Sequence, residues 1–406
     1  MESNRLHGAD FLRAAACLLV LFHHLAQRMS WNQQLPGIEW FRPFAINGSF
    51  GVAVFFVLSG FLLARPFWLA FDAGTAMPSL TTYALRRAAR ILPGFWVALL
   101  LSFVIAITVF GARLDGQLLL RLASGALLVS DWHPVTLFPV EVNGPLWSIG
   151  FEVTSYALLP LGFLLLWPMR RAVPDRWGRL AWLGVIGVVL LLHLAFVTWY
   201  PMDMRGRGWE NGLIGGAKTW MPRYNPFGFF AMFAVGALAA GLQVRLARLR
   251  HWAFDLAALA ALAGATALLA AQAREETSEG WGLLGIPYDF PWFVLAVGAA
   301  LATAPSSRLL GQWLDNPVSR YLARISFGIY IWHYPVLELV RRYWAPDMDH
   351  GQMGDPVRFV VTSGVILAIS IGVAQLSFTF IENPVIRWAR RREPSAPAAL
   401  ATAGAG

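Results

Sequence analysis

The sequence predicts an all-α, polytopic membrane protein with about ten transmembrane helices. Of its 406 residues, 57% are hydrophobic and only 14% are charged, whereas soluble domains carry about 25% charged residues. The chain also holds 19 Trp and 28 Phe. This composition excludes a disordered chain and argues against a soluble enzyme, because a lipid environment is what accommodates so much apolar surface.

Ten apolar segments are each long enough to cross a bilayer, which takes about 20 residues of helix. They lie at residues 10–29, 48–69, 91–110, 145–167, 180–200, 226–244, 252–271, 288–304, 323–343 and 357–381. A further apolar stretch at 118–129 is short and contains Arg121, so we expect an interfacial or re-entrant helix there. The first segment could be mistaken for a signal peptide, but Arg13 interrupts it, and we interpret it as a retained helix.

The arginines predict the orientation of these segments. With the N-terminus in the cytoplasm, more basic residues fall in cytoplasmic segments than in outer ones, as the positive-inside rule requires. An even number of helices then places both termini in the cytoplasm, in a plasma (inner) membrane. We expect one integral membrane domain over residues 1–392 and a disordered cytoplasmic tail over 393–406, which is rich in Ala, Pro and Gly. The net charge of +9 therefore reports orientation, and no nucleic-acid partner is expected.

The first apolar segment carries two ionisable residues, Arg13 and His24, which are costly in a bilayer and often functional. Eleven residues of helix separate them, so they lie roughly 20° apart on one face and about 16 Å apart along the axis. His23 points elsewhere. The alternative is structural: Arg13 reaches the cytoplasmic surface with its long side chain, and His24 is a hydrogen-bonded core residue.

The fourth segment carries a polar stripe of Ser148, Glu152 and Tyr156 on an otherwise apolar helix. The predicted topology places Glu152 and His24 at similar depths, so the carboxylate is a candidate partner for the imidazole. The alternative is a structural tie between two helices.

The ninth segment places Ser326, Tyr330 and His333 on one face, and Pro335 frees a backbone carbonyl nearby. A direct role and plain interhelical hydrogen bonding are both open for Tyr330 and His333. Glu382, near the cytoplasmic edge, is a further candidate that can equally cap a helix or pair with an arginine.

Three arginines precede the third segment: Arg86, Arg87 and Arg90. Guanidinium groups bind phosphate through two parallel hydrogen bonds, so the three are candidates for a phosphate site. They equally suit the role of positive-inside anchors. No Walker loop, GxGxxG, HExxH or GxSxG motif is present, and the single cysteine, Cys17, excludes a disulfide framework and a cysteine-rich metal site; no metal site is expected.

Six blocks in order resemble the acyltransferase family 3 membrane proteins, over nearly the whole chain. The blocks are Arg13 and His24 with ten residues between them, Gly51 to Phe61, Arg87 to Pro93, Pro145 to Glu152, Ile325 to His333, and Ile381 to Pro384. The chain departs from the family at Ala53, where many members carry an acidic residue, which leaves Glu152 as the candidate carboxylate.

The resemblance implies an O-acyltransferase that moves an acyl group, most often acetyl, from cytoplasmic acyl-CoA to a hydroxyl of a sugar, glycan or natural product. It implies that His24 is the catalytic residue, acting as a general base on the acceptor hydroxyl. Arg87 and Arg90, with Arg86 beside them, would hold the CoA phosphates, and Arg13 would line the same tunnel. Acyl-CoA is then a substrate, and no permanently bound cofactor is expected.

Two functions from other classes fit the same buried polar residues. A proton-coupled secondary transporter would use Arg13, His24 and Glu152 as a proton relay. A non-catalytic component of a glycan-export assembly would use them structurally. Transporters usually show internal repeats and broken helices, and the sequence shows no clear example of either.

Overall fold

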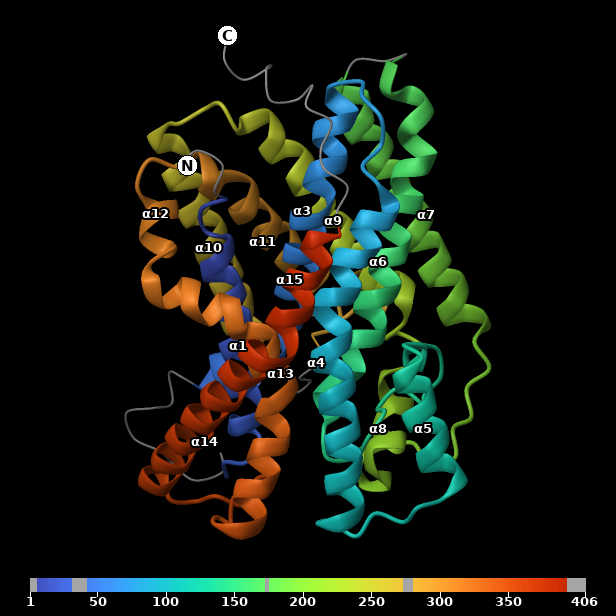
Figure 1. The fold of residues 1–406 in the computed structure, drawn as a ribbon, viewed down its shortest axis with the longest axis vertical. Coiled ribbons are helices and arrows are strands. Elements are labelled where there is room, and N and C mark those ends of the chain that lie inside the picture. The colour runs from blue at the N-terminus through green and yellow to red at the C-terminus, as the bar shows by residue number, and fades with distance from the viewer. Residues whose placement is uncertain (1–5, 31–41, 172–174, 273–279, 393–406) are drawn as a thin grey trace.

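The computed structural model describes residues 6–30, 42–171, 175–272 and 280–392, and these form a bundle of helices (Figure 1). The helices are α1 (Ala9–Ala26), α2 (Arg42–Ile46), α3 (Gly51–Asp72), α4 (Leu80–Thr108), α5 (Gly116–Ala126), α6 (Trp147–Leu166), α7 (Asp175–Trp199), α8 (Gly212–Trp220), α9 (Pro226–Leu246), α10 (Trp252–Gln272), α11 (Trp292–Thr303), α12 (Leu310–Leu314), α13 (Pro317–Tyr343), α14 (Pro356–Ser377) and α15 (Asn383–Arg391). In these ranges the extended pairing is limited to one bridge between Met29 and Met353. The predicted all-α fold is confirmed, whereas the tail predicted at 393–406 lies outside the described residues.

Eight helices of the described part are long and apolar enough to cross a membrane. The other two predicted segments are helical as well. α11 is shorter, at 12 residues, and α13 is long, at 27 residues, but carries several charges. Each of the ten predicted segments therefore coincides with a helix, and the chain is an α-helical integral membrane protein.

The short segment predicted at 118–129 is the amphipathic helix α5, of 11 residues. At 1.5 Å per residue it measures about 16 Å, which is too short to cross a bilayer. Asp115 caps its N-terminus by accepting a hydrogen bond from the backbone of Leu118. The buried Arg121 donates to the carbonyl of Phe138 at 2.7 Å and pairs with Glu141. This charged side chain is tied to the following loop and turns away from lipid.

α3 and α9 pack closely at the centre of the bundle because glycines, which have no side chain, lie at their contact. A Cβ atom at Gly60 would lie 1.9 Å from the carbonyl oxygen of Phe233, and one at Gly236 would lie 1.9 Å from that of Val57. Small residues that bring backbones together are the usual basis of helix association in membranes. α3 is thus fixed between α9 on one side and α1 and α6 on others.

Two irregular backbone features shape the helices around the site. Pro335 in α13 cannot donate to the carbonyl of Ile331, and the Asn143 side chain satisfies that carbonyl at 2.9 Å. The carbonyl that the sequence predicted to be freed by Pro335 therefore has a partner from the loop before α6. A π-helical turn, Phe378–Glu382, joins α14 to α15. Such turns are rare and frequent at functional sites, and this one buries Glu382 against α4.

Candidate active site

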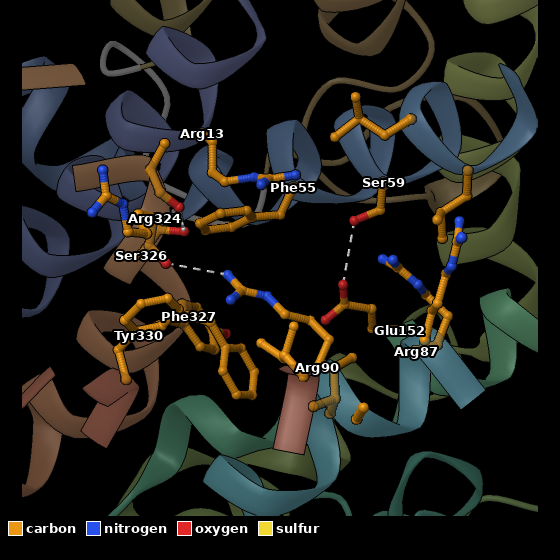
Figure 2. Close-up of a pocket in the computed structure, with 18 of the residues that line it drawn as sticks. Arg13, Phe55, Ser59, Arg87, Arg90, Glu152, Arg324, Ser326, Phe327 and Tyr330 are labelled. Atoms are coloured by element: carbon orange, nitrogen blue, oxygen red, sulfur yellow. Dashed lines mark hydrogen bonds between the residues drawn. The ribbon is translucent and has the colours of Figure 1, made fainter. Parts of the chain in front are cut away.

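A cavity of about 1270 Å³ opens between α1, α3, α4, α6, α13 and the α14–α15 junction. Its described wall contains seven arginines and two acidic residues, Asp10 and Glu152. The arginines are Arg13, Arg86, Arg87, Arg90, Arg320, Arg324 and Arg390. Arg13, Arg87 and Arg90 surround the same space in Figure 2. The excess of guanidinium groups makes the cavity attractive to an anion that carries several charges.

The predicted phosphate site is thus brought together with Arg13. Arg87 and Arg90 both line the cavity from α4, and Arg86 lies beside them. Arg90 donates to the carbonyl of Arg324 at 3.4 Å and lies 3.8 Å from Glu382. These contacts are long, so they orient the Arg90 side chain while leaving it able to bind a phosphate.

Glu152 lies on the cavity wall and has partners other than the one predicted from depth alone. Its Oε1 accepts hydrogen bonds from Tyr156 and, at 3.3 Å, from Ser59 of α3 (Figure 2). Within the described residues it makes no hydrogen bond to His24, so the predicted Glu152–His24 pair is wrong. Two side chains at the same depth along their helix axes meet only if the helix faces that carry them also face each other. Glu152 faces α3, and His24 faces α13.

His24 instead contacts His333 of α13. Nε2 of His333 lies 3.1 Å from Nδ1 of His24, and the ring centroids are 5.1 Å apart. Arg13 and His24 both lie on α1, where Arg13 lines the cavity and His24 contacts α13. His23 points away and contacts the carbonyl of Ile46 and the side chain of Gln27.

The hydrogen bonds of the two histidines define their tautomers. Nδ1 of His333 lies 3.0 Å from the carbonyl of Ile329, so it carries a hydrogen and leaves Nε2 as an acceptor. Nδ1 of His24 lies 2.9 Å from the carbonyl of Val20, so it also carries a hydrogen, which it shares with Nε2 of His333. Nε2 of His24 is then unprotonated, and it has no hydrogen-bond partner in the described part of the chain. This is the arrangement of an imidazole ready to accept a proton.

An aromatic partition separates the cavity from these histidines. Phe55 and Tyr330 form the cavity wall here, with ring centroids 5.8 Å apart. The Tyr330 hydroxyl is held by Ser148, at 2.7 Å, and by the carbonyl of Pro145. Behind it, the Tyr330 and His333 rings lie 6.1 Å apart. Ser148 and Tyr330 therefore line the cavity, whereas His333 and His24 do not belong to its described wall. The ring of His333 neighbours Tyr330, and the ring of His24 neighbours His333.

Sequence reasoning missed part of the cavity. Arg320 and Arg324 begin α13, and Arg390 comes from α15. The i, i+4 spacing of Arg320 and Arg324 places them on one helix face, which is a signal that was available. Nothing local in the sequence brings the start of α13 and the last helix to the Arg87 region, because these segments lie far apart in the chain.

The chain is thus a helical membrane protein with a strongly basic cavity, and two histidines in contact, His24 and His333, lie beyond its described wall. Comparison with known proteins specifies the class further. Residues 6–375 match the family model of the acyltransferase domain, Acyl_transf_3, and the chain belongs to this acyltransferase family.

Several curated relatives are similar along most of the chain. Acyltransferase MdmB of Streptomyces mycarofaciens is 28% identical over 397 residues, which cover 97% of this chain and 95% of that protein. O-acetyltransferase OatA of Staphylococcus aureus is 24% identical, and the putative peptidoglycan O-acetyltransferase YrhL of Bacillus subtilis is 26% identical. The alignments cover 94% and 93% of this chain but only 57% and 54% of those two proteins, so the chain spans little more than half of their length. No solved structure matches.

Proposed function

We propose that this membrane acyltransferase moves an acyl group, most simply acetyl, from cytoplasmic acyl-CoA to a hydroxyl of a sugar, a cell-surface glycan or a related acceptor. The observation that carries the proposal is the cavity, whose described wall contains seven arginines and ends at Tyr330. The ring of Tyr330 neighbours the ring of His333, which in turn contacts His24. The family membership supports the acyl transfer, and the cavity supports an anionic donor.

The size and charge of the cavity suit acyl-CoA. Its volume of about 1270 Å³ exceeds the roughly 300–1,000 Å³ of most small-molecule pockets. CoA carries phosphates at one end and the thioester at the end of a long flexible arm. Arg87 and Arg90 would bind the phosphates, and the arm would extend past Arg13 toward Tyr330. Opening of the Phe55–Tyr330 partition would then bring the thioester to His24.

His24 would act as the general base. Its unprotonated Nε2 would take the proton of the acceptor hydroxyl while the hydroxyl oxygen attacks the thioester carbon. His333 would keep the proton of His24 on Nδ1 and so keep Nε2 basic. The acceptor would approach from the side opposite the arginines, with both chain termini in the cytoplasm. The names of OatA and YrhL support O-acetylation, and the latter supports a peptidoglycan acceptor.

The test is release of CoA from labelled acetyl-CoA by the purified protein in lipid nanodiscs. Soluble peptidoglycan fragments and a mixture of simple glycosides serve as acceptors. We expect acceptor-dependent release of thiol with label recovered in an ester. A proton-coupled transporter would release no thiol, and that outcome would contradict the proposal.

A further inference from the structure

His24 has a further aromatic neighbour, Tyr334 of α13, which is not part of the described cavity wall. The two ring centroids lie 5.1 Å apart, and the rings are nearly perpendicular, at 86°. His24 and Tyr334 are both half-buried, whereas His23 and His333, the other rings in contact with His24, are buried. The two rings that keep part of their surface exposed at this point are therefore adjacent.

The Tyr334 hydroxyl is held and polarised by a buried cation. Nη2 of Arg28 donates to its oxygen at 3.2 Å, and the guanidinium carbon lies 5.6 Å from the ring centroid. Arg28 is only 1% exposed. A hydrogen bond from a cation draws electron density from the phenol oxygen and makes its O–H a stronger donor. In the described part of the chain Tyr334 accepts this bond and donates to no other group, so its hydrogen is available to a ligand.

Arg28 belongs to a balanced set of charges, which we call the Arg28 cluster. Its members are Arg28, Glu338, Arg341, Asp349 and His350. Arg28 donates to Glu338 at 2.7 Å and to Nδ1 of His350 at 3.0 Å, and Arg341 pairs with Glu338 at 2.9 Å. Burial, and then the charge of Arg28, lowers the pKa of His350, which favours the neutral ring that accepts this bond. A buried ion pair is costly to assemble and adds little net stability. Its presence here therefore points to a role in holding Tyr334 next to His24.

A short segment after α13 holds this arrangement in place. The backbone of Gly351 donates to the carbonyl of Gln27 at 2.9 Å, and that of Met353 donates to the carbonyl of Arg28 at 3.0 Å. The backbone of Ser30 returns a bond to Met353 at 2.9 Å. The end of α1, which carries His24, and Arg28 just beyond it are thereby attached to the α13–α14 loop, and the Tyr334 hydroxyl has a defined position.

From this geometry we infer that Tyr334 is a second catalytic residue, which donates a hydrogen bond to the thioester carbonyl oxygen during acyl transfer. This inference rests on the proposed function. The acceptor oxygen forms a bond to the thioester carbon, and its proton passes to Nε2 of His24. The carbonyl electron pair moves onto oxygen, where the Tyr334 hydroxyl stabilises the negative charge. Collapse of this intermediate breaks the C–S bond, and the thiolate takes the proton from the imidazolium, giving an ester and CoA.

Tyr334→Phe tests the inference because it keeps the ring and removes only the hydroxyl. We expect kcat for CoA release to fall about 10²- to 10³-fold, as for other oxyanion-hole donors, with the KM for acetyl-CoA unchanged. The assay uses the full-length protein in nanodiscs with acetyl-CoA and peptidoglycan fragments. Tyr343→Phe, on the exposed end of the same helix, is the matched control and should match the wild type. A Tyr334→Phe kcat within about threefold of the wild type, or a loss confined to KM, would overturn the inference.

A second variant addresses Arg28 as a positioning residue, and its effect in the wild-type background tests the inference even where Tyr334→Phe fails to fold. Arg28→Lys keeps the charge but loses the planar fork that reaches Glu338 and Tyr334 together. We expect Arg28→Lys to lower kcat about tenfold in the wild-type background and to change it little in the Tyr334→Phe background. Equal losses in both backgrounds would contradict the idea that Arg28 acts through Tyr334. No loss in the wild-type background would contradict it as well. His24→Ala distinguishes a failure of the proposed function from a failure of the inference about Tyr334. An active His24→Ala protein contradicts the proposed function itself, whereas an inactive one with an active Tyr334→Phe protein contradicts this inference alone.

Discussion

The basic cavity and the Arg28 cluster differ in how far acidic residues balance their arginines. Among the described residues, the cavity wall holds seven arginines against two acidic residues, Asp10 and Glu152. In the Arg28 cluster two arginines face two carboxylates, because Glu338 and Asp349 each lie within 3.8 Å of both Arg28 and Arg341. A wall with excess positive charge attracts an anionic ligand, whereas a balanced cluster fixes the geometry of its own members.

This difference divides the proposed reaction between two places. The cavity would bind the donor, and the histidines with Tyr334 would carry out the chemistry. Phe55 and Tyr330 stand between the two. This division predicts two kinds of mutant. Substitutions in the cavity should lower the affinity for the donor, and substitutions at the histidines should lower kcat.

The largest effect is expected at His24. His24→Ala should lower kcat for CoA release by about 10²- to 10⁴-fold, because the general base is lost. His23→Ala should be milder, since His23 contacts Ile46 and Gln27 and points away from His333. The measurement is thiol release by both variants at saturating acetyl-CoA. Retention of more than about a tenth of the wild-type activity by His24→Ala would indicate a structural histidine.

The second effect concerns Arg87 and Arg90. Alanine at either position should weaken acetyl-CoA binding about 10- to 100-fold, the range expected for a lost charge-assisted hydrogen bond. Lysine should restore binding only in part, since ammonium lacks the planar fork. Arg171→Ala, on an exposed arginine outside the cavity, is the control. Altered insertion with normal affinity in the inserted protein would instead support the positive-inside anchor interpretation.

A third, smaller effect is expected at His333. His333→Gln keeps a polar side chain but does not reproduce an imidazole Nε2 acceptor next to Nδ1 of His24. We expect kcat to fall about tenfold, with the affinity for acetyl-CoA unchanged, because the loss acts on the base through its tautomer. Steady-state kinetics that separate kcat from KM provide the check. A change in KM alone would place His333 in the donor site.

The smallest effect is the dependence of donor binding on salt. Raising the salt from about 0.1 M to about 1 M shortens the screening length from about 10 Å to about 3 Å. Acetyl-CoA binding should weaken a few-fold over this range, because the seven arginines act partly at a distance. S-acetyl-pantetheine, which has no phosphates, is the control and should bind weakly at every salt concentration. Equal salt responses of the two donors would remove the phosphate argument.

The sequence predicted the fold better than it predicted the contacts within the site. Hydropathy and length located ten helices and the short α5, because both signals are local. Spacing placed Arg13 and His24 on one face of α1 for the same reason. The His24–His333 contact could not be derived, since it depends on which faces of α1 and α13 meet. Arg390 lines the cavity because α15, which follows the π-helical turn, packs against α4, and no local signal in the sequence predicts that long-range contact.

Equilibrium binding of acetyl-CoA to His24→Ala and Arg90→Ala, measured in parallel on correctly inserted protein, tests the division between cavity and histidines most directly. The account predicts that His24→Ala binds acetyl-CoA as the wild type does, although it is inactive, and that Arg90→Ala binds it about 10- to 100-fold more weakly. Normal affinity in Arg90→Ala would contradict it. The phosphate site would then lie elsewhere, at Arg13 of the cavity or at Arg65 of α3. The arginines in the first half of α4 would then serve to orient that helix in the membrane.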